Sequence, residues 1–189
     1  MKRCSMLALL VLLTMIVVPA AVSQTAGEHS AQTAKDEARI KTREQLRQLL
    51  DKVGPAIKVS FRQSEKAPFN FVGELKDGLK NADSFEIVVG VTLDQTIGFR
   101  IFPHYNGAYV NVDKARDSTA LMRQMLRFSD QVFLFWGADQ GGDIFTGYTF
   151  TLESGFPDAA ITVVLRSIVN MDQYVGRLRP AIDGSAAVK

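Results

Sequence analysis

The pattern of apolar residues divides the chain into an N-terminal targeting segment and a longer part with the periodicities of a folded domain. Residues 6–18 are apolar except for one threonine, follow two basic residues, and precede a proline and several small residues. This arrangement is typical of a secretory signal peptide. We therefore expect residues 1–23 to be a signal peptide cleaved between Ser23 and Gln24, and the protein to act in the periplasm or outside the cell.

Retention of the apolar run as an N-terminal anchor is the alternative. The run is 13 residues long, shorter than the roughly 20 that a membrane-spanning helix needs. Cleavage is therefore the favoured interpretation, and the cleaved protein would have no membrane span.

The next part of the chain predicts a linker and then a helix. Residues 24–33 are rich in Ala, Gln, Ser and Thr and show no periodicity, which is typical of a linker. A helix is predicted over 34–53, because its last apolar residues recur every three or four positions; they are Leu46, Leu49, Leu50 and Val53. Gly54-Pro55 is expected to end this helix.

Alternating or β-branched apolar residues predict a group of strands at 57–62, 69–75, 85–93 and 96–102. The dipeptide Asn106-Gly107 favours a two-residue hairpin, because both residues tolerate positive φ. The register of that hairpin sets Arg100 opposite Asp113, where the two side chains would form an exposed ion pair.

The second half predicts a helix at 118–128, a hairpin and a long helix from Pro157 to Leu178, followed by a flexible tail at 183–189. A two-residue turn at Gly141-Gly142 would place Trp136 opposite Gly147. The order is therefore α, three to five strands, α, two strands, α. Short connections indicate an α+β fold with a mainly antiparallel sheet and helices packed on one face, in a single domain at 34–182.

Charge and cysteine content narrow the function classes. The chain has 22 basic and 20 acidic residues, and the only charged residues before Gln24 are two basic ones, so the exported part has no net charge. There is no basic excess to bind nucleic acid. The single cysteine, Cys4, lies before the apolar run and would leave with it, so no disulfide or thiol nucleophile is expected.

No residue pattern predicts catalytic, cofactor or metal chemistry. His104 lies at the predicted hairpin without partner ligands, and the acidic turn 139–143 lacks the glutamate that a calcium loop requires. Ser154 lacks the glycine two positions before it that a nucleophile elbow needs. Acids flanking that corner, Glu153 and Asp158, suit a helix N-terminus. We therefore expect a protein that is not an enzyme and has no cofactor.

Part of the second half resembles a known family. The run from Trp136 through Asp139 and Gly141 to Tyr148-Thr-Phe-Thr-Leu, followed by a long helix, is similar to the YbjN-like domains, which themselves resemble type III secretion chaperones in fold. The order of strands and helices matches over about 42–180. The resemblance implies a chaperone-like or sensory role through protein binding, with a possible homodimer, and it carries no catalytic residues.

The helix at 118–128 supplies the candidate partner surface. Met122, Met125 and Phe128 form a stripe at helical spacing, and methionines adapt to varied partners when they are exposed. The same spacing also suits a core face. The leading hypothesis is an exported module that binds a protein or peptide; the alternatives are a small-ligand or lipid carrier with the last helix over a sheet pocket, and a hydrolase with an unrecognised site.

Overall fold

The computed structural model describes residues 22–186, and the chain divides into two compact units, residues 1–34 and 35–189. The predicted signal peptide lies outside the described residues except for its last two. Helix α1 covers Val22–Val53 and spans the boundary between the units. The linker predicted at 24–33 is therefore helical, which corrects the expectation of irregular chain. Alanine, glutamine and glutamate, which are good helix formers, make up much of this stretch.

The second half of α1 is the predicted amphipathic helix, and it ends at Val53 as expected. Its buried apolar residues are Leu46, Leu50 and Val53. The segment that follows is not the predicted strand. Gly54–Ile57 forms a short 3-10 helix, η1, after which Lys58 takes a left-handed conformation with φ 55°. Proline near the start of η1 favours this turn, because its fixed φ suits a helical backbone.

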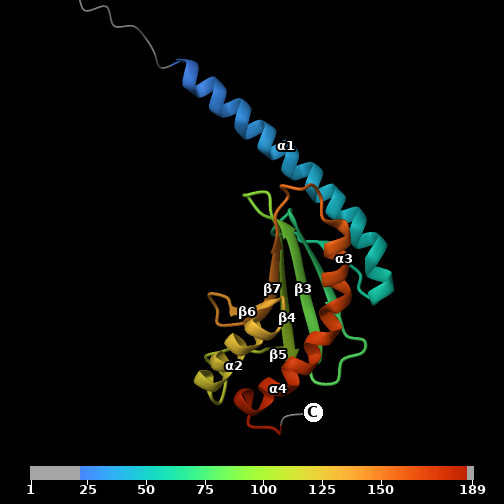
Figure 1. The fold of residues 1–189 in the computed structure, drawn as a ribbon, viewed down its shortest axis with the longest axis vertical. Coiled ribbons are helices and arrows are strands. Elements are labelled where there is room, and N and C mark those ends of the chain that lie inside the picture. The colour runs from blue at the N-terminus through green and yellow to red at the C-terminus, as the bar shows by residue number, and fades with distance from the viewer. Residues whose placement is uncertain (1–21, 187–189) are drawn as a thin grey trace, which may run out of the picture. The chain divides into compact units, whose positions relative to one another are not determined.

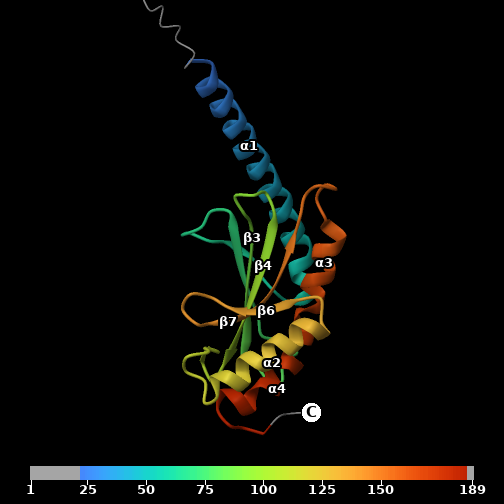
Figure 2. The ribbon, with the colours of Figure 1, turned by 60° about the vertical axis from the view of Figure 1, so that its left-hand side comes forward.

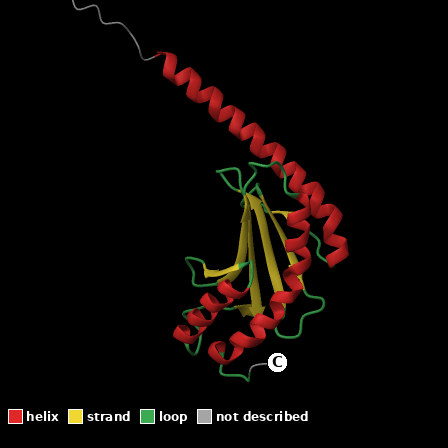
Figure 3. Cartoon of the chain, in the orientation of Figure 1, coloured by secondary structure: helices red, strands yellow, loops and turns green. Residues whose placement is uncertain are grey.

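Seven antiparallel strands form one sheet in the order β1-β2-β3-β4-β7-β6, with β5 paired to β4 (Figures 1 and 3). The strands are β1 (Arg62–Gln63), β2 (Asn70–Leu75), β3 (Ser84–Val91), β4 (Ile97–Tyr105), β5 (Ala108–Tyr109), β6 (Phe135–Ala138) and β7 (Ile144–Phe150). The predicted α+β class is confirmed. The strand predicted at 57–62 is wrong, because β1 begins at its last residue.

Helix α2 (Ser118–Gln131) begins at the predicted cap, where an Asp117 carboxylate oxygen accepts a hydrogen bond from the backbone N–H of Ala120 at 2.9 Å. The long helix predicted after Pro157 is divided into α3 (Asp158–Ser167), the 3-10 helix η2 (Ile168–Met171) and α4 (Asp172–Ile182). Over the described residues, no helix combines the length and hydropathy that a membrane crossing requires.

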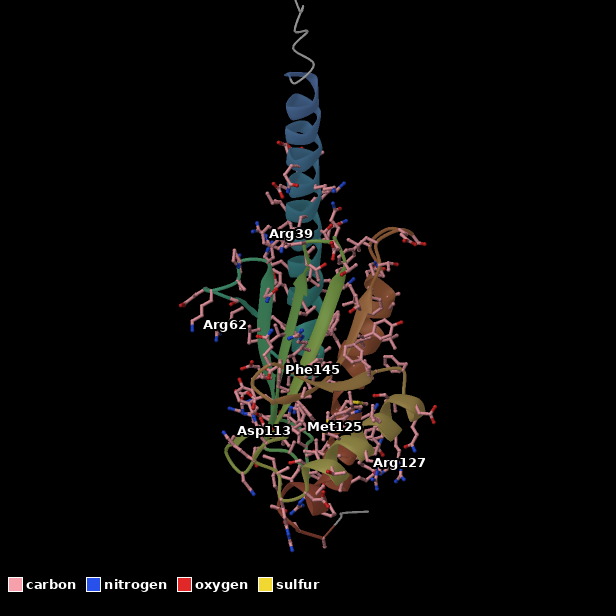
Figure 4. The ribbon with its side chains drawn as sticks, turned by 90° about the vertical axis from the view of Figure 1, so that its left-hand side faces the viewer. Arg39, Arg62, Asp113, Met125, Arg127 and Phe145 are labelled. Carbon is pink, nitrogen blue, oxygen red and sulfur yellow. The ribbon has the colours of Figure 1, made fainter. Side chains whose placement is uncertain are left out.

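The two faces of the sheet differ because successive strand residues point to opposite sides. On one face, buried side chains of β3 and β4 pack with the helices (Figures 1 and 2); this core includes Leu46, Phe85, Ile87, Phe99, Ile101, Ile161, Val175 and Leu178. No helix of residues 35–186 covers the opposite face, which is turned toward the viewer in Figure 4. We call this uncovered side the open face.

The first hairpin forms where the dipeptide Asn106-Gly107 predicted it, with φ values of 54° and 77°. Its ladder is short, because β7 pairs with the remaining length of β4. Arg100 therefore lies between Val88 and Gly147. The predicted pairing of Arg100 with Asp113 is wrong.

The second hairpin differs from the prediction by one residue of register. The backbone N–H of Asp139 donates to the carbonyl of Asp143 at 3.0 Å, so the loop has three residues, and its last, Gly142, has φ 80°. Trp136 is consequently opposite Thr146, and the predicted pairing with Gly147 is wrong. A shift of one residue exchanges the faces of a strand, and this register turns the indole of Trp136 into the core.

Candidate functional site

The candidate site is a groove of about 440 Å³ between helix α2 and the edge strand β6, which we call the α2–β6 groove. The two elements follow one another in the chain, and they meet where the Ser129 hydroxyl accepts a hydrogen bond from the backbone N–H of Trp136 at 2.8 Å. The groove is lined by Val112, Asp113, Met122, Met125, Leu126, Trp136, Gly137, Ala138, Asp139, Gln140 and Gly142.

Two apolar side chains of α2 are exposed to solvent at this groove. Met122 is 46% exposed and Leu126 is 71% exposed. They lie four residues apart, so they share one side of the helix. An apolar surface of this kind on a folded domain marks an interaction site when it is grouped and not scattered. The groove therefore offers a binding surface for apolar groups.

Trp136 contributes a buried side chain to the wall of the groove. The residue is 5% exposed, and its indole N–H has no hydrogen-bond partner among the described residues. A buried indole N–H usually finds an acceptor. Aromatic contacts hold the ring, since its centroid lies 5.8 Å from that of Phe128 and 6.3 Å from that of Tyr174.

The structure separates the three predicted surface residues. Met122 lies in the exposed part of the groove, whereas Met125 is 5% exposed and contributes to its buried base. Phe128 is 0% exposed, and its ring packs edge-on against Tyr174 at 4.8 Å beneath the guanidinium of Arg177. Phe128 therefore belongs to the core, and its inclusion in a partner surface is corrected.

The sequence reasoning did not include Leu126 and Trp136 in the candidate partner surface, although Leu126 had a signal in the sequence. Leu126 follows Met122 by four residues, which places it on the same side of the helix. Trp136 had no such signal, because the one-residue error in hairpin register placed it beside a glycine.

The residues that we considered as candidates for metal binding or catalysis either make contacts within the fold or lie exposed at a turn. An oxygen of Asp139 accepts the backbone N–H groups of Gly141 and Asp143 at 2.9 and 3.0 Å, so this acid holds its own turn. The ring of His104 lies 4.2 Å from that of Tyr109. Ser154 lies exposed in the turn before α3. Across residues 22–186, no three His, Cys, Asp or Glu side chains gather as a metal site.

In comparisons with known proteins, no family model, curated protein or solved structure matches the chain.

Proposed function

We propose that this chain is an exported binding module without enzymatic activity, and that it holds an apolar segment of another protein in the α2–β6 groove. The observation that carries the proposal is the exposure of Met122 and Leu126 beside the only tryptophan of the chain. The resemblance of the second half to the YbjN-like domains is in line with this proposal.

Burial of apolar surface supplies the binding energy in this proposal. Complete burial of a leucine or methionine side chain is worth about 1.5–3 kcal/mol, and 71% of Leu126 is still available for burial. Methionine has three rotatable bonds and a polarisable sulfur, so Met122 can adapt to partner side chains of different shape.

Tryptophan fluorescence tests the proposal directly, because the chain has a single tryptophan and it lines the groove. The protein beginning at Gln24 is titrated with short synthetic peptides in which leucine alternates with serine, and with all-serine peptides of the same length. We expect the leucine peptides alone to shift the emission of Trp136 in a saturable manner.

Variants locate the binding surface. Met122→Glu and Leu126→Glu place a charge in the groove, and we expect each to weaken peptide binding by about tenfold or more, the equivalent of about 1.4 kcal/mol. Val163 on α3 is 61% exposed and lies outside the groove, so Val163→Glu is the matched control and should bind like the unchanged protein. Equal binding by all three variants, or no response to any leucine peptide, would reject the proposal.

A further inference from the structure

The α2–β6 groove has acidic side chains at the end formed by the turn between β6 and β7. Two carboxylates, Asp113 and Asp139, line it, and no basic side chain is among the described residues of its lining. The exposed apolar residues Met122 and Leu126 belong to the wall on α2. The groove therefore joins an apolar wall to an acidic end.

Backbone contacts position Asp113 beside this turn. The backbone N–H of Val112 donates to the carbonyl of Gly142 at 2.8 Å, and the backbone N–H of Asp113 donates to Oδ1 of Asn111 at 2.9 Å. A β-carbon added to Gly142 would lie 2.9 Å from Oδ2 of Asp113. The carboxylate is therefore held at the end of the groove although the residue is exposed.

The two carboxylates differ in what they already bind. An oxygen of Asp139 accepts two backbone N–H groups of its own turn. No hydrogen bond or ion pair joins the carboxylate of Asp113 to another described residue. Lys114, the next residue, is exposed and does not line the groove. An ionised carboxylate offers about four lone-pair positions to donors, and those of Asp113 are available to a partner.

The exposed basic residues of α2 lie outside the groove. Arg123 and Arg127 are exposed, and neither belongs to the lining. In Figure 4, Asp113 and Arg127 lie on opposite sides of Met125, which forms the buried base of the groove. The carboxylates therefore set the sign of the charge at the turn end.

We infer that the segment bound in the α2–β6 groove carries a lysine or arginine next to its apolar residues, and that this cation pairs with Asp113. The inference rests on the proposed function of the groove and specifies the charge of the partner. Burial against Met122 and Leu126 supplies the affinity. Complementary charge selects among apolar segments and fixes the direction in which the chosen one lies.

Three peptides of equal length test this inference. All alternate leucine with serine, and in two of them lysine or glutamate replaces the central serine. At an ionic strength of about 0.01 M, we expect the lysine peptide to bind about fivefold or more tightly than the glutamate peptide, with the serine peptide between them. The difference should shrink at about 1 M, where charges are screened beyond about 3 Å. Titration followed by the emission of Trp136 gives the three dissociation constants.

Two variants assign the preference to the acidic end of the groove. Asp113→Asn removes the charge and keeps the shape of the side chain. We expect it to abolish the preference for lysine and to leave the affinity for the serine peptide within about twofold. Asp94→Asn, at an exposed turn outside the groove, is the matched control and should keep the preference.

The outcomes separate this inference from the proposed function. No response to any of the three peptides would overturn both. Equal affinity for the lysine and glutamate peptides, or a preference for glutamate, would overturn the inference alone, because the groove would still bind apolar segments. A preference for lysine that survives in Asp113→Asn, or that is lost in Asp94→Asn, would overturn it as well.

Discussion

The carboxylate of Asp172 accepts hydrogen bonds from both the backbone N–H and the side-chain amide of Asn81, each at 2.9 Å. The same carboxylate accepts the backbone N–H groups of Lys80 and Ala82, also at 2.9 Å. Asp172 is 6% exposed and begins α4. One buried acid thus ties the connection between β2 and β3 to the last helix, across 91 positions of sequence.

Replacement of this acid should destabilise the fold substantially. Asp172→Ala leaves four N–H donors without their acceptor, and a buried unsatisfied donor costs about 1–3 kcal/mol. Part of this connection is exposed and can be rehydrated, so we expect a total loss of about 2–4 kcal/mol in the free energy of unfolding. Urea denaturation measures it. Asp94→Ala, at an exposed turn, is the control, and equal transition midpoints for the two variants would contradict the prediction.

Phe128 and Met122 should respond oppositely to truncation although both come from α2. Phe128 is 0% exposed, so Phe128→Ala should lower the free energy of unfolding by about 3–5 kcal/mol. Met122 is 46% exposed, and Met122→Ala should change it by about 0.5 kcal/mol or less. Chemical denaturation of both variants decides between a core and a surface role, and a small effect of Phe128→Ala would return that residue to the candidate surface.

Two glycines of the open face should differ in their tolerance of a methyl group. A β-carbon at Gly147 would lie 2.7 Å from the carbonyl oxygen of Phe99 and 2.9 Å from the ring of Phe135. Gly147→Ala should therefore cost about 1–3 kcal/mol. Gly98→Ala meets no such contact and should stabilise the protein by about 0.4–1 kcal/mol, because it restricts the unfolded chain. Thermal unfolding measures both effects, and we expect a lower melting temperature for Gly147→Ala and a higher one for Gly98→Ala than for the unchanged protein. Equal melting temperatures for the two variants would show that the sheet relaxes around the added methyl group at Gly147.

Tyr109 should be identifiable in an alkaline titration. Burial, and then the hydrogen bond to Glu86, raises the pKa of Tyr109 from 10.0 to about 12. Absorbance of tyrosinate should therefore show a component near pH 12 that is missing in Tyr109→Phe. Glu86→Gln should lower this pKa only in part, because burial is the larger cause. A component near pH 12 that persists in Tyr109→Phe would contradict the assignment to Tyr109.

The same shift makes stability depend on pH in a defined window. Below pH 10 the phenol is protonated in both the folded and the unfolded chain; between about 10 and about 12 only the unfolded chain releases the proton. The free energy of unfolding should therefore fall across this window, and it should fall less in Tyr109→Phe. Urea midpoints at the two ends of the window provide the measurement.

Local signals in the sequence predicted much of the fold. The Asn106-Gly107 turn, the Asp117 cap and the apolar spacing before Val53 each act over a few residues, and each is found where it was expected. Prediction failed where local patterns are ambiguous. Residues 57–61 alternate like a strand, but the proline-containing turn before them forms η1.

The candidate site was only half predictable for a related reason. Helical spacing grouped Met122, Met125 and Phe128, but spacing alone does not say which side of a helix meets the core. That depends on where β6 and α4 pack. The ring of Tyr174, 46 residues beyond Phe128, buries this phenylalanine and leaves Met122 and Leu126 at the groove.

The sequence by itself determined the class of fold, the first hairpin turn and the approximate positions of most helices and strands, because these follow from short-range sterics, capping and periodicity. Tertiary structure alone decided which strands become neighbours. Pairing of β7 with β4 placed Gly147 where Asp113 was expected beside Arg100. Strand pairing is settled by burial of the whole sheet against the helices, a sum over distant residues that no local pattern contains.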